Sequence, residues 1–222
     1  MSDPELRPPE PETAPVPQQP RLNLRARVYL IAAGVVIVGL GALVAFLLLR
    51  KGDKSWKPDP ALLEELGEEV EVGDYRIRPP RDYRRLPAVS AQGRPGDRVY
   101  MWLGPARADG ARPQLTVLHV TSPPDEADND LEAILDKRLK RAREHWRAWI
   151  QEPVEAGRVN GLKFVRTRWG GINIATGQPT RGFVYLARDG NTVIQISSQD
   201  VEPDHEQPLQ LAETAALTFK KP

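Results

Sequence analysis

Three histidines are the side chains best suited to acid–base or metal chemistry in this sequence: His119, His145 and His205. The chain contains no cysteine, which excludes disulfides, thiol nucleophiles and cysteine-ligated zinc together. None of the histidines is followed by a second metal-type ligand in a familiar spacing. We therefore expect neither a metal nor a cofactor, and we interpret His119 as a hydrogen-bonded residue of a central strand.

An acidic stretch from Asp125 to Asp130 has the composition of a calcium loop. An EF-hand loop needs glycine at its sixth position and a bidentate glutamate at its twelfth. Counted from Asp125, these positions hold Asp130 and Asp136, so the motif fails. The acids instead suit the positive end of a helix that begins here, with Asp128 or Asn129 as its cap.

The remaining motifs of common enzymes are also missing from the sequence. The glycines at Gly170, Gly171 and Gly190 are not followed by the lysine and hydroxyl residue of a phosphate-binding loop. No serine stands in the strand-to-helix elbow of a hydrolase. We therefore expect a protein without catalytic activity.

A basic cluster in the middle of the chain is the strongest candidate for a contact surface. Its six cations surround a single acid, Glu144. The cluster comprises Lys137, Arg138, Lys140, Arg141, Arg143 and Arg147. A solvated helix face, contact with anionic lipid and contact with a protein partner all fit this composition. Nucleic acid is excluded as a partner by the whole-chain balance, because 31 Lys and Arg against 30 Asp and Glu give a net charge of +1.

The N-terminal part of the chain predicts a membrane anchor. Residues 1–27 are rich in proline and polar residues, so we expect a disordered tail. Val28–Leu49 is apolar and uncharged, and about 20 such residues span a hydrocarbon core as a helix. The run is too long for the apolar part of a signal peptide, and Arg50 and Lys51 follow it. We expect a single-pass transmembrane helix, a linker over residues 50–60 and a soluble domain over residues 61–222.

Two further features near the span bear on its topology and on the oligomeric state. Nearby Lys and Arg residues are balanced across the span, so the positive-inside rule does not decide the orientation. A short polar tail before a first span favours an uncleaved signal anchor, with the soluble domain extracytoplasmic. Gly41 and Ala45 are small residues four positions apart, which is compatible with a homodimer of the spans.

Apolar periodicity predicts the elements of the soluble domain. A helix over residues 130–151 shows an apolar stripe at spacings of three and four, and Pro153 follows its end. A short helix follows Asp59, and a final helix covers residues 206–219. Strands are expected over residues 70–77, 98–103, 114–121, 154–159, 162–174, 181–188 and 192–198. Tight turns between the later strands predict an antiparallel sheet, and the fold class is α+β, as an α/β/α sandwich or its two-layer version.

The order of these elements resembles the PsbP-like fold. The resemblance is carried by the opening segment Tyr75–Tyr83, the long helix after residues 115–121, the hairpin at Asn160-Gly161, the strands on either side of Asp189-Gly190, and the closing helix ending at Phe219. It covers residues 68–219 and consists of element order rather than a signature motif. It implies a non-enzymatic binding or assembly role, and it maps no binding residues onto this chain.

Three functional hypotheses follow. The first is a membrane-tethered scaffold domain that acts through protein contacts at the membrane surface. The second is an enzyme or small-molecule carrier with a pocket between the sheet and the long helix, where His119, Arg166 and Asp189 would converge. The third makes the proline-rich tail the working part.

Overall fold

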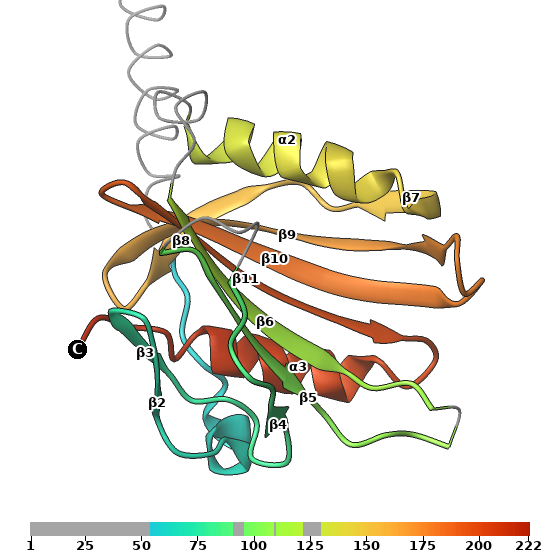
Figure 1. The fold of residues 1–222 in the computed structure, drawn as a ribbon, viewed down its shortest axis with the longest axis horizontal. Helices are drawn as coiled ribbons and strands as arrows, with labels where there is room; N and C mark the ends of the chain where they lie inside the picture. Colours follow the sequence, from blue (N-terminus) through green and yellow to red (C-terminus); the bar gives the residue numbers. More distant parts are fainter. Residues whose placement is uncertain (1–53, 91–95, 109, 122–129) are drawn as a thin grey trace, which may run out of the picture. The chain divides into compact units, whose positions relative to one another are not determined.

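The computed structural model describes residues 54–90, 96–108, 110–121 and 130–222 (Figure 1). The chain divides into two compact units, Met1–Leu49 and Arg50–Pro222, and the first lies outside the described residues. The expected tail, the transmembrane helix at Val28–Leu49 and the small-residue face at Gly41 and Ala45 lie there too. Among the described helices, none has the length and apolar character needed to cross a bilayer.

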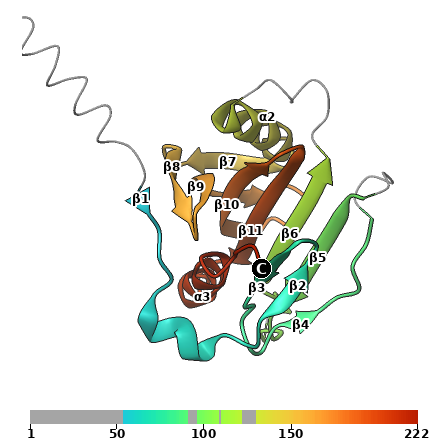
Figure 2. The ribbon, with the colours of Figure 1, turned by 90° about the vertical axis from the view of Figure 1, so that its left-hand side faces the viewer.

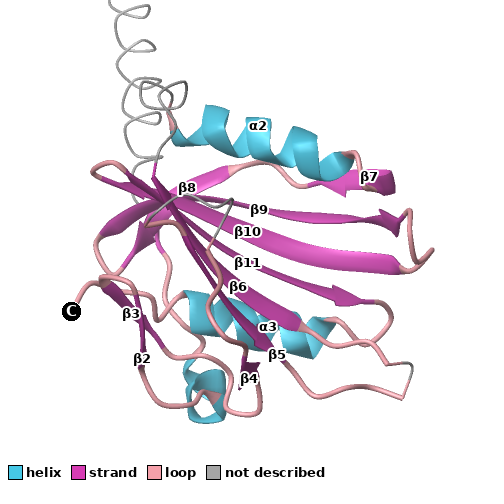
Figure 3. Cartoon of the chain, viewed as in Figure 1, coloured by secondary structure: helices cyan, strands magenta, loops and turns pink. Residues whose placement is uncertain are grey.

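A sheet of nine strands forms the centre of the second unit, within the described residues (Figures 1 and 3). Its order is β1-β8-β9-β10-β11-β6-β5-β4, and β7 pairs with the far end of β9. The described pairings are antiparallel except β1 with β8. The strands are β1 (Lys54–Ser55), β4 (Arg84–Arg85), β5 (Arg98–Leu103), β6 (Gln114–Thr121), β7 (Trp146–Gln151), β8 (Glu155–Val159), β9 (Leu162–Asn173), β10 (Pro179–Asp189) and β11 (Thr192–Val201).

Helices cover both faces of this sheet, so the α/β/α arrangement and the largely antiparallel sheet are confirmed (Figure 2). Helix α2 (Leu131–Arg143) packs on one face through Ile134, Leu135 and Leu139. Helix α3 (Glu206–Ala216) packs on the other. The 3₁₀ helix η1 (Pro60–Glu65) and the hairpin of β2 (Val70–Val72) and β3 (Tyr75–Ile77) join the α3 side.

The expected long helix is shorter than the sequence suggested, and its second half is a strand. Helix α2 ends at Arg143, and Trp146–Gln151 pairs with β9 as β7. The register shifts between Arg147 and Ile150, where Ala148 adopts a φ of 48°. A bulge adds one residue to a strand, so side chains three apart reach one face. The rings of Trp146 and Trp149 thus both pack on the ring of Trp169, with centroid distances of 4.8 and 5.0 Å. Their spacing of three residues is therefore the same as that of two residues on one face of a helix.

The other local expectations agree with the structure to within a few residues, with one exception. Residues 70–77, expected as one strand, form the antiparallel β2–β3 hairpin, because Gly73 adopts a φ of 64° at the turn between them. The Asn160-Gly161 turn connects β8 to β9 with φ values of 46° and 87°, as a tight hairpin requires. Strand β9 continues through Gly170 and Gly171 without a break. The side chain of Arg181 fills the space of a Cβ at Gly170, and a Cβ at Gly171 would lie 3.2 Å from the Cβ of Trp146. Helix α2 is capped by Asp130, whose Oδ1 accepts from the backbone N–H of Ala133 at 2.7 Å, rather than by Asp128 or Asn129.

The folded domain begins within the range expected to be linker. Lys54–Ser55 pairs in parallel with Gly157 and Arg158 of β8, and the N–H of Trp56 donates to the carbonyl of Arg158 at 2.9 Å. The indole of Trp56 occupies the space that a side chain at Gly157 would need. Asp59 then caps η1 through a hydrogen bond from the N–H of Ala61, as the sequence predicts.

Candidate functional site

Strands β9 and β10 place a row of polar side chains on the face that α3 covers. Alternate residues of a strand share a face, so Arg166 and Arg168 of β9 lie beside Arg181 and Tyr185 of β10. Helix α3, which covers this face, contributes Glu213, whose carboxylate accepts hydrogen bonds from Arg166 and Arg168. The sequence reads as an ordinary half-buried strand here, and only the sheet register and the helix bring these groups together.

A network around Arg166 of β9 joins it to residues of β8, β10 and α3. Its guanidinium donates to Glu155 Oε2 at 2.9 Å, to Tyr185 Oη at 2.8 Å and to Glu213 Oε1 at 3.2 Å. The hydroxyl of Tyr185 donates to Glu213 Oε1 at 2.7 Å. The ring of Trp56 lies 4.4 Å from the guanidinium, in cation–π geometry. The network therefore fastens β8, β9, β10 and α3 to one another, and Trp56, the residue after β1, packs on its guanidinium.

Two pKa shifts describe the charge state of this network. Burial raises the pKa of the Tyr185 hydroxyl, and the negative charge of Glu213 raises it further. Hydrogen bonds from Arg166 lower the pKa of Glu155. At neutral pH the tyrosine is thus a neutral hydrogen-bond donor between charged partners, and it does not supply a nucleophile.

A groove of about 540 Å³ opens beside this network, between α3 and the strands β7, β9 and β10. Phe183 and Leu209 line its apolar part. Ile150 of β7 also lines it, with 55% of its surface exposed. Arg168, Glu206 and Glu213 supply charges along its length. A volume of this size lies within the range of about 300 to 1,000 Å³ found for ligand pockets.

The arginines of the groove are already engaged by carboxylates. Arg168 Nη2 lies 2.5 Å from Glu213 Oε2, and Arg181 Nε lies 2.5 Å from Glu202 Oε1. Arg181 lies flat over Gly170, where no Cβ obstructs it. The pairs leave Glu152 and Glu206 as exposed carboxylates for which no ion pair is found within the described residues. The groove is therefore apolar at its base and acidic at its rim.

The three histidines lie in three different environments. His119 is buried on β6 between the rings of Tyr75 and Tyr100, and burial lowers its pKa to about 4. Its Nε2 has no hydrogen-bond partner among the described residues, so the expectation of a hydrogen-bonded histidine is wrong. His145 is exposed between α2 and β7. Only His205 lines the groove, and its Nδ1 lies 3.1 Å from the carbonyl of Pro203.

The convergence that a catalytic or carrier pocket would require is not found in the described part of the chain. Tyr75 touches His119 with its ring and donates its hydroxyl to Asp189, whereas Arg166 belongs to the network with Tyr185. The cavity between the sheet and α2 has a volume of only about 190 Å³. Within the described residues, no group of three or more His, Asp and Glu side chains forms a metal site.

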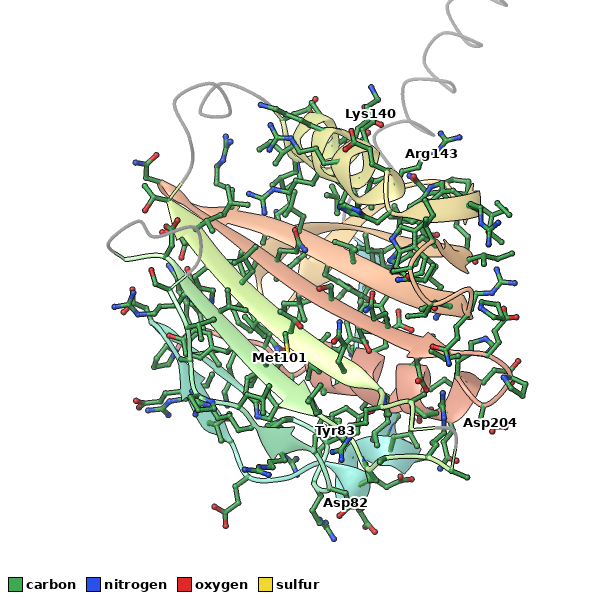
Figure 4. The ribbon with its side chains drawn as sticks, turned by 45° about the vertical axis from the view of Figure 1, so that its right-hand side comes forward. Asp82, Tyr83, Met101, Lys140, Arg143 and Asp204 are labelled. Atoms are coloured by element: carbon green, nitrogen blue, oxygen red, sulfur yellow. The ribbon has the colours of Figure 1, made fainter. Side chains whose placement is uncertain are left out.

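The predicted basic cluster is divided between two elements. Lys137, Arg138, Lys140, Arg141 and Arg143 lie on α2, but Arg147 lies on β7 and not on the helix. Figure 4 shows Lys140 and Arg143 directed away from the sheet, on the outer side of α2. Lys140 pairs with Asp136 at 2.8 Å, and Arg138 turns inward to Gln195. The remaining exposed cations, Arg141, Arg143 and Arg147, face solvent.

The sequence does not predict the groove residues, because the apolar spacing assigns Ile150 to a helix and the structure has it on β7. The usable signal is the pair Arg166 and Arg168, which are two cations on a strand face that begins with the apolar Leu162 and Phe164. Such a pair requires either solvent or acidic partners on that face. Glu213, on the last helix, was the acidic partner to look for.

The fold of the chain is similar to that of several solved structures, three of which are described here. No family model and no curated protein sequence matches it. The cyanobacterial PsbP of Synechocystis matches with a TM-score of 0.48 and 16% identity over 70% of this chain and 92% of its own. LpqN of Mycobacterium tuberculosis, a protein involved in cell envelope biogenesis, matches with a TM-score of 0.47 and 14% identity. The match covers 76% of this chain and 99% of LpqN.

A structure from Bacteroides thetaiotaomicron matches with a TM-score of 0.46 and 8% identity over 70% of this chain. The present chain spans 48% of the length of that protein. A PsbP protein, the family that the element order resembles, is thus among the structural neighbours. At these scores and identities the likenesses assign no ligand, partner or activity to this chain.

Proposed function

We propose that the chain is a single-pass membrane protein whose extracytoplasmic domain is a non-enzymatic binding module for a protein partner. The observation that carries this proposal is the open groove beside α3, with Ile150 exposed at its edge. A groove with the apolar lining of Ile150, Phe183 and Leu209 and charged side chains around it has the composition of a protein contact site. The anchor and its orientation rest on the sequence of residues 1–57.

The chemistry of the groove favours binding over catalysis. Its arginines are held by Glu213 and Glu202, and the neighbouring Tyr185 is held by Glu213 and Arg166. These groups satisfy one another rather than converge on a position that a reacting atom could occupy. The alternative of a carrier pocket between the sheet and α2 is disfavoured, because about 190 Å³ is smaller than the usual ligand pocket.

A photo-crosslinking amino acid placed at Ile150 tests the proposal in the native membrane. With p-benzoylphenylalanine at this position of the full chain, irradiation should give a discrete adduct with a second protein. Val89 is the matched control, since it is 58% exposed and lies against β5, near the opposite edge of the sheet. Adducts absent from the Ile150 position, or identical at both positions, would overturn the proposal.

We further propose that the exposed cations of α2 and β7 contact anionic lipid. Arg141 and Arg143 are exposed near the end of the helix, on the two flanks of its buried stripe. Cations held near an anionic membrane surface contribute about 1 kcal/mol each. Replacing both by glutamine in the unit Arg50–Pro222 should weaken co-sedimentation with phosphatidylglycerol vesicles by roughly thirtyfold.

The same measurement needs a control for loss of charge alone. Arg84 and Arg112 are exposed arginines on other parts of the domain. Their double replacement by glutamine removes the same charge and should retain most of the vesicle binding. Equal losses in the two double variants would mean that the contact is non-specific, and the assignment to α2 would fail.

A further inference from the structure

Strand β7 has one edge that pairs with no strand in the described part of the chain. Its other edge pairs with β9, and its six residues are mostly exposed. An open edge presents backbone N–H and C=O groups to any extended segment that approaches it. This edge borders the groove, because Ile150 and Glu152 line it.

The side chains beside this edge define what could lie against it. Ile150 stands opposite Gly170, over which Arg181 lies, so Ile150 faces the α3 side. Glu152 follows two residues later, lines the same groove, and donates its N–H to the carbonyl of Arg168 at 2.9 Å. The edge therefore shows an apolar side chain and a carboxylate at the spacing of one strand face.

The charge at the groove rim determines which charge a bound segment should carry. Arg168 and Arg181 are neutralised by Glu213 and Glu202. Glu152 on the strand side and Glu206 at the start of α3 are exposed. A cationic side chain placed between these two carboxylates gains from both, whereas an anionic one is repelled by both.

We infer that the groove binds an extended segment of a protein partner, added to the edge of β7, with an apolar residue and a lysine or arginine two positions apart. The inference rests on the proposed function and specifies its ligand. Directly opposed side chains on neighbouring strands interact most strongly. The apolar residue lies opposite Ile150, and the cation lies opposite Glu152 and within reach of Glu206. Strand addition of this kind takes affinity from the backbone and specificity from alternate side chains.

A set of synthetic peptides tests the charge requirement. The probe is a seven-residue peptide with isoleucine at its centre, lysine two positions to either side and serine elsewhere, so that it fits parallel or antiparallel. The comparison peptide carries glutamate in place of lysine. Fluorescence anisotropy with the full chain in phosphatidylcholine nanodiscs should show the lysine peptide binding about tenfold tighter at low salt.

Charge reversal in the protein should invert this preference. The double variant Glu152→Lys and Glu206→Lys should bind the glutamate peptide better than the lysine peptide. Glu132→Lys reverses an exposed acid on α2, across the sheet, and should keep the wild-type preference. Equal affinities for both peptides in the wild type, or the same loss in the Glu132 control, would overturn the inference.

Backbone methylation separates strand addition from binding by side chains alone. Only alternate N–H groups of an added strand point toward its neighbour. N-methylation of one alternate set should abolish binding of the lysine peptide, and methylation of the other set should leave it within about threefold. If the peptide still binds after N-methylation of either set, it is not added as a strand to the edge of β7, and that part of the inference fails.

The outcome also distinguishes this inference from the proposed function. If adducts form at Ile150 in native membranes while the peptides show no charge preference, the partner binds there but belongs to another class. If neither adducts nor peptide binding are found, both proposals fail together.

Discussion

Replacing Asp200 by alanine is expected to lower the free energy of unfolding of the domain by about 3 to 5 kcal/mol. The carboxylate lies on β11 with no solvent exposure, 2.6 Å from Nη1 of Arg107. Arg107 also donates to the carbonyls of Val201 and Asp204, at 2.9 and 3.3 Å. The pair thereby holds the connection between β5 and β6 against the end of β11. Removal of one partner leaves a largely buried guanidinium without its counter-charge.

Urea denaturation followed by tryptophan fluorescence measures this effect. All five tryptophans of the chain lie within residues 54–222, so the signal reports the domain alone. The matched control is Lys140→Ala, which breaks a pair whose two side chains are 75% and 60% exposed. It should cost less than about 0.5 kcal/mol. A loss below about 1 kcal/mol in Asp200→Ala would show that the buried pair contributes little.

Lowering the pH from 6.5 to 4 is expected to remove about 3 kcal/mol of stability through His119 alone. Burial among Tyr75, Tyr100 and Phe219 lowers the pKa of His119 from 6.5 to about 4, and the charge of Asp74 opposes the shift only partly. Between these two values the unfolded chain binds a proton that the folded domain does not. Stability therefore falls as pH falls through this window, and the contribution of His119 levels off within about one pH unit below 4.

Other groups with shifted pKa values act in a lower pH range. Hydrogen bonds from Lys220, Arg166 and Lys221, respectively, lower the pKa values of Glu69, Glu155 and Asp189. Depressed carboxyl pKa values stabilise the fold above the unfolded values of 4.5 and 3.8, and this contribution is lost only below them. The window above pH 4.5 thus belongs to His119.

A leucine at position 119 isolates the contribution of the histidine. His119→Leu removes the buried Nε2 that lacks a partner, so stability at pH 7 should stay within about 1 kcal/mol of the wild type. Its unfolding free energy should be nearly constant from pH 6.5 to 4.5. His145→Gln removes an exposed histidine and should keep the wild-type pH profile. A His119→Leu profile as steep as that of the wild type would contradict this assignment.

The sequence was informative where one local rule decides one element. Asn160-Gly161 specifies a hairpin whatever surrounds it, and Asp59 followed by proline specifies a helix start. Residues 114–121 are apolar on both faces, which predicts a strand in the middle of the sheet, and β6 lies between β11 and β5. These features depend on neighbours in the chain.

The errors arose where contacts between distant residues decide the structure. The bulge at Ala148 places Trp146 and Trp149 of β7 three residues apart on one face, which is also the spacing of a helix. The apolar pattern of α2 therefore continues into β7, and the sequence predicts one long helix for both elements. The groove could not be predicted once Ile150 was assigned to that helix. The pairing of Glu213 with Arg166 and Arg168 depends on where α3 crosses the sheet, which no local spacing encodes.

The attachment of β1 to β8 determines how the domain would respond to mechanical tension. A pull along the chain from the side of residue 53 first loads Lys54–Ser55, whose hydrogen bonds to the parallel strand bear such a force as shear. Behind them, Trp56 is wedged against Gly157 and stacked on Arg166. Because Arg166 also holds Tyr185 and Glu213, extraction of this indole would loosen the wall of the groove before the rest of the sheet unravels.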